Sequence, residues 1–226
     1  LPFEKDFYKK HQVDAHFVGH PLLDAISDLP EISVENFKKE NNLNEKEIIA
    51  LLPGSREQEV EKMLSLMLSV RDSFKNYQFV IAGAPSLPKE FYQKFVDDDV
   101  HFVSNKTYDL LRCSKAALVT SGTATLETAL LNVPEIVCYR TSTISYEIGK
   151  RVVKNIKFIS LVNLIMDREI VKELIQKELN TENLVTELQK ILEGQKRDEM
   201  LRNYELLREK LGGKGASEHA AEIIVN

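Results

Sequence analysis

The chain has 226 residues, of which 43% are hydrophobic and 29% charged, and its formal net charge is −5. Because the charge is negative, no nucleic-acid partner is expected. A chain of this length buries roughly 70 to 75% of its unfolded surface, enough for one sizeable core without disulfides or metals. The cysteines, Cys113 and Cys138, lie in or beside apolar runs, which indicates buried thiols in a reducing compartment. No stretch approaches the roughly 20 apolar residues of a membrane-spanning helix.

Apolar runs of strand length alternate with segments of helical period along most of the chain. Strands are predicted over residues 15–18, 48–52, 78–82, 100–103, 116–120, 135–139 and 157–161. Helices are predicted over residues 33–41, 57–74, 89–95, 108–114, 124–131 and 145–154. From residue 168 onward the apolar residues keep only a helical period. The pattern predicts an α/β fold: a Rossmann-like, mainly parallel sheet with helices on both faces, followed by a helical tail.

A small-residue turn follows the predicted strand 48–52 and leads directly into a long helix. Gly54 lets the backbone approach a ligand closely, Ser55 offers a hydroxyl, and Arg56 can clamp phosphate oxygens. The free N–H groups of the helix start form an anion site. The spacing is neither that of an ATP-type P-loop nor that of a Gly-x-Gly-x-x-Gly dinucleotide turn. A simple helix-capping turn with a surface arginine is an equally good interpretation of this motif alone.

A second turn of the same kind, Ser121-Gly122-Thr123, follows the predicted strand 116–120. Glu127 lies one turn inside the next helix, where it can accept hydrogen bonds from a pair of sugar hydroxyls; the alternative is a surface glutamate. Carboxyl ends of strands are the edge at which open α/β sheets bind ligands. Two anion-ready turns at that edge therefore predict a bound nucleotide.

Other charged and titratable residues give weaker signals. Asp97-Asp98-Asp99 has a spacing that holds a metal in some glycosyltransferases, but a solvated acidic turn is the commoner interpretation. The histidines show no metal-ligand spacing, so neither a metal nor a cofactor is expected. A cationic cluster suits the end of a helix dipole, although an anionic lipid surface could use it too; it comprises Lys150, Arg151, Lys154 and Lys157.

Five motifs, in chain order, resemble lipid-A-disaccharide synthase: residues 17–22, 51–56, 121–127, 139–140 and 160–164. The resemblance implies a GT-B glycosyltransferase with two facing Rossmann-like domains, of which the C-terminal one binds UDP. Its implied substrate-binding residues are Gly54, Ser55, Arg56, Val103, Ser121, Gly122, Thr123, Glu127 and Asn163. Arg56 is also the implied catalytic group, because it would stabilise charge on the diphosphate.

Two of these assignments are less direct. Val103 is placed near the uracil by analogy with related UDP-sugar transferases. Asn163 lies in Val162-Asn163-Leu164, where the family usually has Pro-Asn-Leu. The asparagine is expected to keep its contact role, but Val162 does not set the rigid turn that a proline would.

The implied reaction transfers 2,3-diacylglucosamine from its UDP derivative to 2,3-diacylglucosamine 1-phosphate (lipid X) and releases UDP. Residues 1–30 are expected to be a remnant of the N-terminal domain and linker, 31–192 the UDP-sugar-binding domain, and 193–226 a C-terminal helical tail. The general base should lie in the missing half, so this piece is expected to bind UDP weakly and to be inactive alone.

The resemblance further implies a cytoplasmic protein that is peripheral on the inner face of the inner membrane. A homodimer through the C-terminal helices is a further expectation. Two alternatives stay open: another UDP-GlcNAc-type transferase or epimerase of the same fold, and a non-catalytic nucleotide-binding or dimerisation module.

Overall fold

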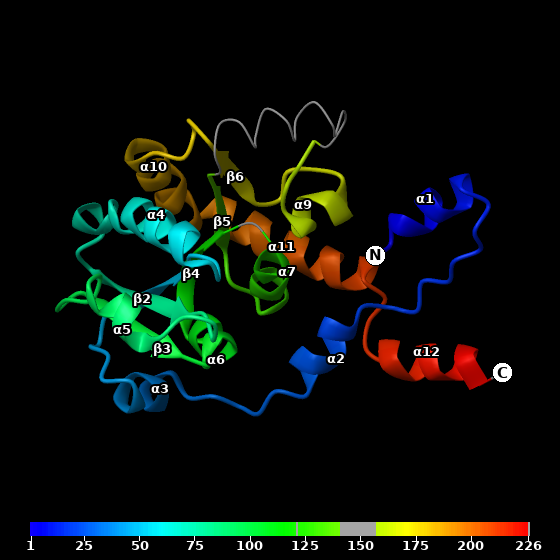
Figure 1. Ribbon diagram of the computed structural model, residues 1–226, viewed down its shortest axis with the longest axis horizontal. Helices are drawn as coiled ribbons and strands as arrows, with labels where there is room; N and C mark the ends of the chain where they lie inside the picture. Colours follow the sequence, from blue (N-terminus) through cyan, green and yellow to red (C-terminus); the bar gives the residue numbers. More distant parts are fainter. Residues whose placement is uncertain (121, 141–156, 226) are drawn as a thin grey trace.

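A parallel sheet forms the centre of the protein in the computed structural model, which describes residues 1–120, 122–140 and 157–225 (Figure 1). Its six strands have the order β3-β2-β1-β4-β5-β6, and every neighbouring pair is parallel. The strands are β1 (Glu47–Leu52), β2 (Tyr77–Gly83), β3 (Val100–Ser104), β4 (Ser114–Thr120), β5 (Glu135–Tyr139) and β6 (Lys172–Ile175). The strand order reverses between β1 and β4, which makes their carboxyl ends the switch point of the sheet.

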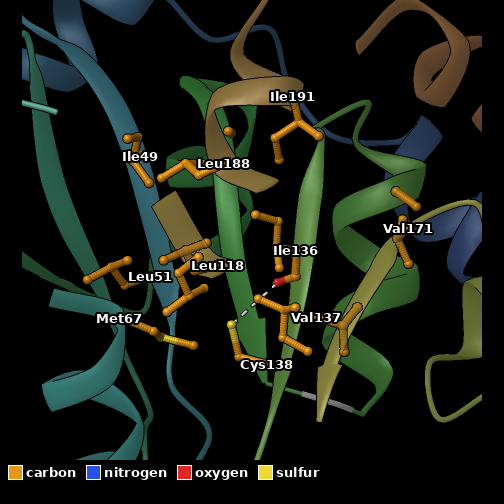
Figure 2. Close-up of a cluster of buried hydrophobic side chains, with 14 of the residues drawn as sticks. Ile49, Leu51, Met67, Leu118, Ile136, Val137, Cys138, Val171, Leu188 and Ile191 are labelled. Atoms are coloured by element: carbon orange, nitrogen blue, oxygen red, sulfur yellow. Dashed lines mark hydrogen bonds between the residues drawn. The ribbon is translucent and has the colours of Figure 1, made fainter. Parts of the chain in front are cut away.

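Helices cover both faces of the sheet because alternate strand residues point to opposite sides. On β1, Ile49 and Leu51 enter a large apolar cluster with Met67 of α4 and Leu188 of α10 (Figure 2). The other face packs on α3 and α6. The helices are α1 (Glu4–Lys10), α2 (Pro21–Ser27), α3 (Val34–Glu40), α4 (Glu57–Leu68), the 3-10 turn η1 (Arg71–Ser73), α5 (Lys89–Gln93), α6 (Thr107–Arg112), α7 (Thr123–Leu130), α9 (Leu161–Met166), α10 (Thr181–Leu192), α11 (Gln195–Lys210) and α12 (Ala216–Val225).

Helix α2, from the first part of the chain, lies next to the C-terminal helix α12 to one side of the sheet (Figure 1). Asp24 of α2 accepts hydrogen bonds from the backbone N–H groups of Gly215, at 2.6 Å, and Ser217, at 3.1 Å. Lys214 donates to Asp28 at 2.7 Å. The last turn of α12 leaves Ile224 and Val225 more than 80% exposed, at 83% and 85%. Residues far apart in the sequence therefore form one joint, and an apolar helix end projects beyond it.

The predicted fold class is confirmed, and five predicted strands correspond to β1 to β5. The strands predicted over 15–18 and 157–161 are wrong: the first segment is irregular, and α9 begins at Leu161. The helix-only prediction after residue 168 missed β6, because its apolar residues Leu174 and Ile175, together with the preceding Val171, also fit a helical spacing. The helix predicted over 145–154 lies outside the described residues. Both cysteines are buried and free, as predicted.

Among the described residues, no helix combines the length and the apolar character that crossing a membrane requires.

Candidate functional site

A pocket of about 420 Å³ opens at the carboxyl ends of β1, β2 and β4. Its walls are the turn between β1 and α4, the loop after β2, the start of α6, and the turn between β4 and α7. The lining residues are Leu52, Gly54, Ser55, Glu59, Ala82, Gly83, Ala84, Pro85, Thr107, Thr120, Gly122, Thr123, Ala124 and Glu127. The pocket therefore lies at the switch point, and the two turns singled out in the sequence meet there.

The turn before α4 depends on Gly54, which has φ of +103°. A Cβ atom there would lie 3.0 Å from Oε2 of Glu59, so a side chain would meet both backbone strain and crowding. Ser86, in the loop after β2, donates from Oγ to the Ser55 carbonyl at 2.8 Å and ties the two walls together. The side chain of Arg56, at the N-cap of α4, makes no capping hydrogen bond. Within the described part of the chain, the first N–H groups of α4 are therefore available to an anion.

The turn before α7 is built on Gly122, whose φ of +154° places it in a region that side chains disfavour. A Cβ atom at Gly122 would meet nothing within 4 Å, so this position faces open space. Thr125 donates from Oγ1 to the Gly122 carbonyl at 2.9 Å and fixes the turn. Gly122, the N-cap of α7, has no side chain that could cap the helix, so among the described residues the first N–H groups of α7 are available to an anion. Ser121 lies outside the described residues.

Glu127 faces the pocket from the first turns of α7, and Tyr108 of α6 contacts it. The Tyr108 hydroxyl donates to Glu127 Oε1 at 3.0 Å. Burial raises the pKa of Tyr108 to about 12, and the nearby Glu127 charge acts in the same direction. The phenol therefore stays protonated at neutral pH and acts as a donor to the carboxylate. Sequence reasoning missed Tyr108, because nothing local indicates its contact with a helix two elements further along the chain.

Arg56 and Val103 do not line the pocket. Arg56 is the N-cap of α4, at the rim beside Ser55; its side chain is exposed and makes no hydrogen bond or ion pair with the described residues. Val103 is 3% exposed and packs in the core between the sheet, α3 and α6. Arg56 therefore lies at the rim with an exposed side chain, whereas the position of Val103 indicates a packing role.

Asn163 lies in a closed polar network instead of the pocket. The residue is fully buried. Its Oδ1 accepts from the N–H groups of Ile170, at 2.6 Å, and Val171, at 3.0 Å. Its Nδ2 donates to the Val171 carbonyl at 2.9 Å and to Glu173 Oε1 at 2.8 Å. The expected substrate contact therefore becomes a structural role, since the amide has no group left for a ligand.

The remaining charged motifs lie elsewhere. Asp97 and Asp99 precede β3, at the amino edge of the sheet opposite the pocket, where Asp97 pairs with Arg71 and Asp99 with Lys46. The cations Lys150, Arg151 and Lys154 lie outside the described residues. Lys157 Nζ is 3.7 Å from Asp167 Oδ1. The acidic turn is therefore an ion-paired surface feature and not a part of the pocket.

The fold is of the GT-B type, which this chain shares with several solved structures. A UDP-N-acetylglucosamine 2-epimerase structure has a TM-score of 0.57 and 18% identity, over 97% of this chain and 54% of that one. WaaG, a glycosyltransferase involved in lipopolysaccharide biosynthesis, has a TM-score of 0.52 and 18% identity, over 98% of this chain and 60% of that one. The S. aureus MnaA-UDP co-structure has a TM-score of 0.56 and 16% identity, over 89% and 51%. At these identities the likeness shows the fold alone.

Comparisons of the sequence identify one family among the proteins that have this fold. A family model described as lipid-A-disaccharide synthetase matches residues 1–225, and the chain belongs to this family. Lipid-A-disaccharide synthase of Syntrophus aciditrophicus is 37% identical over 98% of this chain and 60% of its own length. The Persephonella marina enzyme is 36% identical over 99% of this chain and 62% of its own length. The chain therefore spans about 60% of the length of these relatives.

Proposed function

We propose that this chain binds the UDP part of an acylated UDP-glucosamine, as the nucleotide half of a lipid-A-disaccharide synthase. The observation that carries the proposal is the pocket itself, in which two glycine turns and two helix starts converge, neither of them capped by a side chain of the described residues. Such helix starts attract anions through free N–H groups and the helix dipole. A diphosphate is the anion that spans two neighbouring sites of this kind.

The proposed contacts follow from the positions of the side chains. Gly54, Ser55 and the start of α4 hold the diphosphate, and Arg56 swings from the rim to clamp it. Gly122, Thr123 and the preceding Ser121 surround the nucleotide. Glu127 accepts hydrogen bonds from the ribose hydroxyls. Each group stabilises negative charge or orients the nucleotide without a metal ion.

In the proposed reaction, the 6-hydroxyl of lipid X attacks the anomeric carbon of UDP-2,3-diacylglucosamine. The new glycosidic bond forms with inversion, and the bond to UDP breaks. Arg56 and the helix starts stabilise the charge that grows on the leaving diphosphate. The base that takes the acceptor proton belongs to the part of the relatives that this chain does not span, so the 226-residue chain alone is inactive.

We further propose the division into 1–30, 31–192 and 193–226, with the first and last segments assembling beside the sheet. The hydrogen bonds from Gly215 and Ser217 to Asp24 support that joint. The exposed apolar end of α12 supports either of two contacts, with the N-terminal domain or with a second copy. Because the proposed substrates carry acyl chains, the enzyme is proposed to act at the cytoplasmic surface of the inner membrane.

Isothermal titration with UDP tests the proposed nucleotide site. Arg56→Ala should weaken UDP binding by roughly tenfold or more, since charge-assisted hydrogen bonds are worth about 1.5 to 3 kcal/mol. It should leave uridine binding unchanged, because uridine has no phosphate. Arg202→Ala removes an exposed arginine from α11, far along the chain from either turn, and should change neither affinity.

Two results would contradict the proposal. One is a wild-type chain that does not bind UDP. The other is an Arg56→Ala variant whose affinity for UDP matches that of the Arg202→Ala control. Transfer by the 226-residue chain alone, from UDP-diacylglucosamine to lipid X, would contradict the assignment of the base to the remainder of the enzyme. Transfer from UDP-GlcNAc but not from its acylated form would favour the alternative UDP-GlcNAc-type enzyme.

A further inference from the structure

We propose that Tyr108 is a positioning residue, which holds the Glu127 carboxylate in the orientation that recognises the adjacent hydroxyls of the nucleotide ribose. The inference rests on the proposed UDP site and adds a specificity determinant to it. It starts from the contact of two half-buried side chains on different helices. Tyr108 is at the start of α6 and Glu127 is on α7, and the hydroxyl reaches Oε1 over 3.0 Å.

The surroundings of the pair place it in the pocket wall. Thr107, which precedes Tyr108, lines the pocket together with Glu127 and Thr123. Glu127 Oε1 accepts from Tyr108, while Oε2 accepts no hydrogen bond from the described residues. One oxygen of the carboxylate is therefore tied to the protein. The other keeps its lone pairs for a ligand, and Oε1 keeps a second acceptor position.

Two adjacent hydroxyls match this arrangement, because a carboxylate presents two acceptor oxygens in one plane. A glutamate side chain that is free to rotate loses conformational entropy when a ligand orders it. Tyr108 imposes that order before binding. A phenol with a pKa of about 12 does not ionise at neutral pH, so the pair persists throughout the range in which binding is measured.

The alternative is that Tyr108 merely packs α6 against α7. A packing role and a positioning role differ in what they do to different ligands. Loss of packing weakens every ligand of the pocket by the same factor. Loss of positioning weakens only the ligand whose hydroxyls Glu127 binds, so the ratio of two affinities separates the roles.

The experiment measures dissociation constants of the whole chain for UDP and for 2′,3′-dideoxy-UDP, which lacks both ribose hydroxyls. The wild type should prefer UDP by roughly tenfold or more, as expected when hydrogen bonds to a charged acceptor are lost. Tyr108→Phe should reduce this preference by roughly three- to tenfold and leave the affinity for the dideoxy compound unchanged. Tyr77→Phe, at the amino end of β2, is the matched control and should keep the wild-type ratio.

A double-mutant cycle isolates the pair. Glu127→Gln should abolish most of the preference, and adding Tyr108→Phe to it should have no further effect on the ratio. In the wild type, the carboxyl carbon of Glu127 should shift in NMR spectra when UDP binds and stay unshifted with the dideoxy compound. The NMR measurement needs no variant, and it tests the contact between Glu127 and the ribose hydroxyls on which the positioning role depends.

The outcomes separate the inference from the proposed function. An unchanged ratio in Tyr108→Phe, or an equal loss of affinity for both ligands, overturns the positioning role while the UDP site stands. Independent effects of the two substitutions overturn it as well. A wild-type chain that does not bind UDP overturns both.

Discussion

Two polar clusters in this protein are each built around a glutamate, one in a strand and one in a helix. The two clusters differ in what their polar atoms contact. In the first, Glu173 accepts from Ser160 Oγ at 2.7 Å and from Asn163 Nδ2 at 2.8 Å, and its Oε2 accepts from the Ile159 N–H at 2.9 Å. In the second, Glu127 accepts from Tyr108 alone among the described residues and opens onto a pocket. The first cluster is saturated and closed to solvent, and the second keeps acceptors for a ligand.

The contrast distinguishes structural polar residues from binding residues more reliably than their residue types do. A buried amide or carboxylate whose partners are all internal stabilises the fold, because each bond replaces one to water. A half-buried carboxylate with an open acceptor beside glycine turns stabilises little, yet it can bind. Substitutions in the first cluster should therefore lower stability, and those in the second should lower affinity.

The largest effect is expected for Asn163→Ala. The substitution leaves the buried N–H groups of Ile170 and Val171 without their acceptor and removes a donor from Glu173. Several unsatisfied buried groups should lower the free energy of unfolding by about 3 kcal/mol or more. Urea denaturation measures it. Asn203→Ala, in which a partly exposed asparagine loses its bond from Arg168, should cost less than about 0.5 kcal/mol. Equal costs for the two would show that the closed network is not structural.

Gly54→Ala should affect stability and binding together. Alanine at φ of +103° is strained, and such strain costs about 1 to 3 kcal/mol. The added methyl also displaces Glu59 from the turn that lines the pocket, so the affinity for UDP should fall. Gly194→Ala is a matched control, since Gly194 has φ of +82° with open space around it and lies at the start of α11. It should cost similar stability and leave UDP binding unchanged. A similar loss of affinity in both variants would show that the turn has no special role.

The residues around the pocket, here called the open cluster, were easier to predict from the sequence than the closed cluster around Glu173. Gly54, Ser55, Gly122, Thr123 and Glu127 follow strand, turn and helix signals that are local, and parallel strands bring such turns to one edge. The partners in the closed cluster lie only 7 to 14 residues apart, on α9, on β6 and in the loops beside them, but no sequence pattern indicates which of their polar atoms meet.

The predictions that failed concern β6, Tyr108 and Val103, and each depends on contacts that exist only in the folded protein. The apolar spacing of β6 also fits a helix. A charged residue, Glu173, stands where a buried strand would normally have an apolar one, and it is tolerated there because Ser160 and Asn163 donate hydrogen bonds to its carboxylate. Tyr108 gave no signal, because its contact with Glu127 exists only once α6 and α7 have packed on the sheet. Val103 lies near the carboxyl end of β3, at the edge of the sheet where the pocket opens, but its side chain points into the core.

Glu135 belongs to neither cluster. It is a third kind of carboxyl group, and its titration should make the stability of the protein depend on pH. It is fully buried at the start of β5, and neither carboxyl oxygen has a hydrogen-bond partner in the described part of the chain. Burial, and secondarily the charge of Glu173, raises its pKa well above the ordinary value. Because the folded state holds this proton more tightly, the associated stability is full below the unfolded-state pKa. It declines as pH rises toward the folded-state pKa.

Between pH 5 and 8, Glu135 should therefore lower the free energy of unfolding by at most about 1.4 kcal/mol per pH unit. Glu135→Gln should flatten this dependence, because a glutamine does not titrate. Glu187→Gln, at a partly exposed position of α10 that pairs with Lys190, should keep the wild-type slope. Chemical denaturation at several pH values measures the slope for the wild type and for both variants. Identical slopes in the wild type and Glu135→Gln would show that Glu135 does not retain its proton.

The smallest effect is expected for Thr120→Val, which tests whether an unpaired polar atom near the pocket serves the ligand. Thr120 ends β4 and contributes to the pocket wall, but its Oγ1 is buried and has no hydrogen-bond partner among the described residues. Valine has nearly the same shape and removes that unsatisfied atom, so the protein should gain about 1 kcal/mol of stability. UDP affinity should stay unchanged, because a hydroxyl closed to solvent presents nothing to a ligand. Weaker UDP binding in this variant would assign Thr120 to the open cluster beside Glu127.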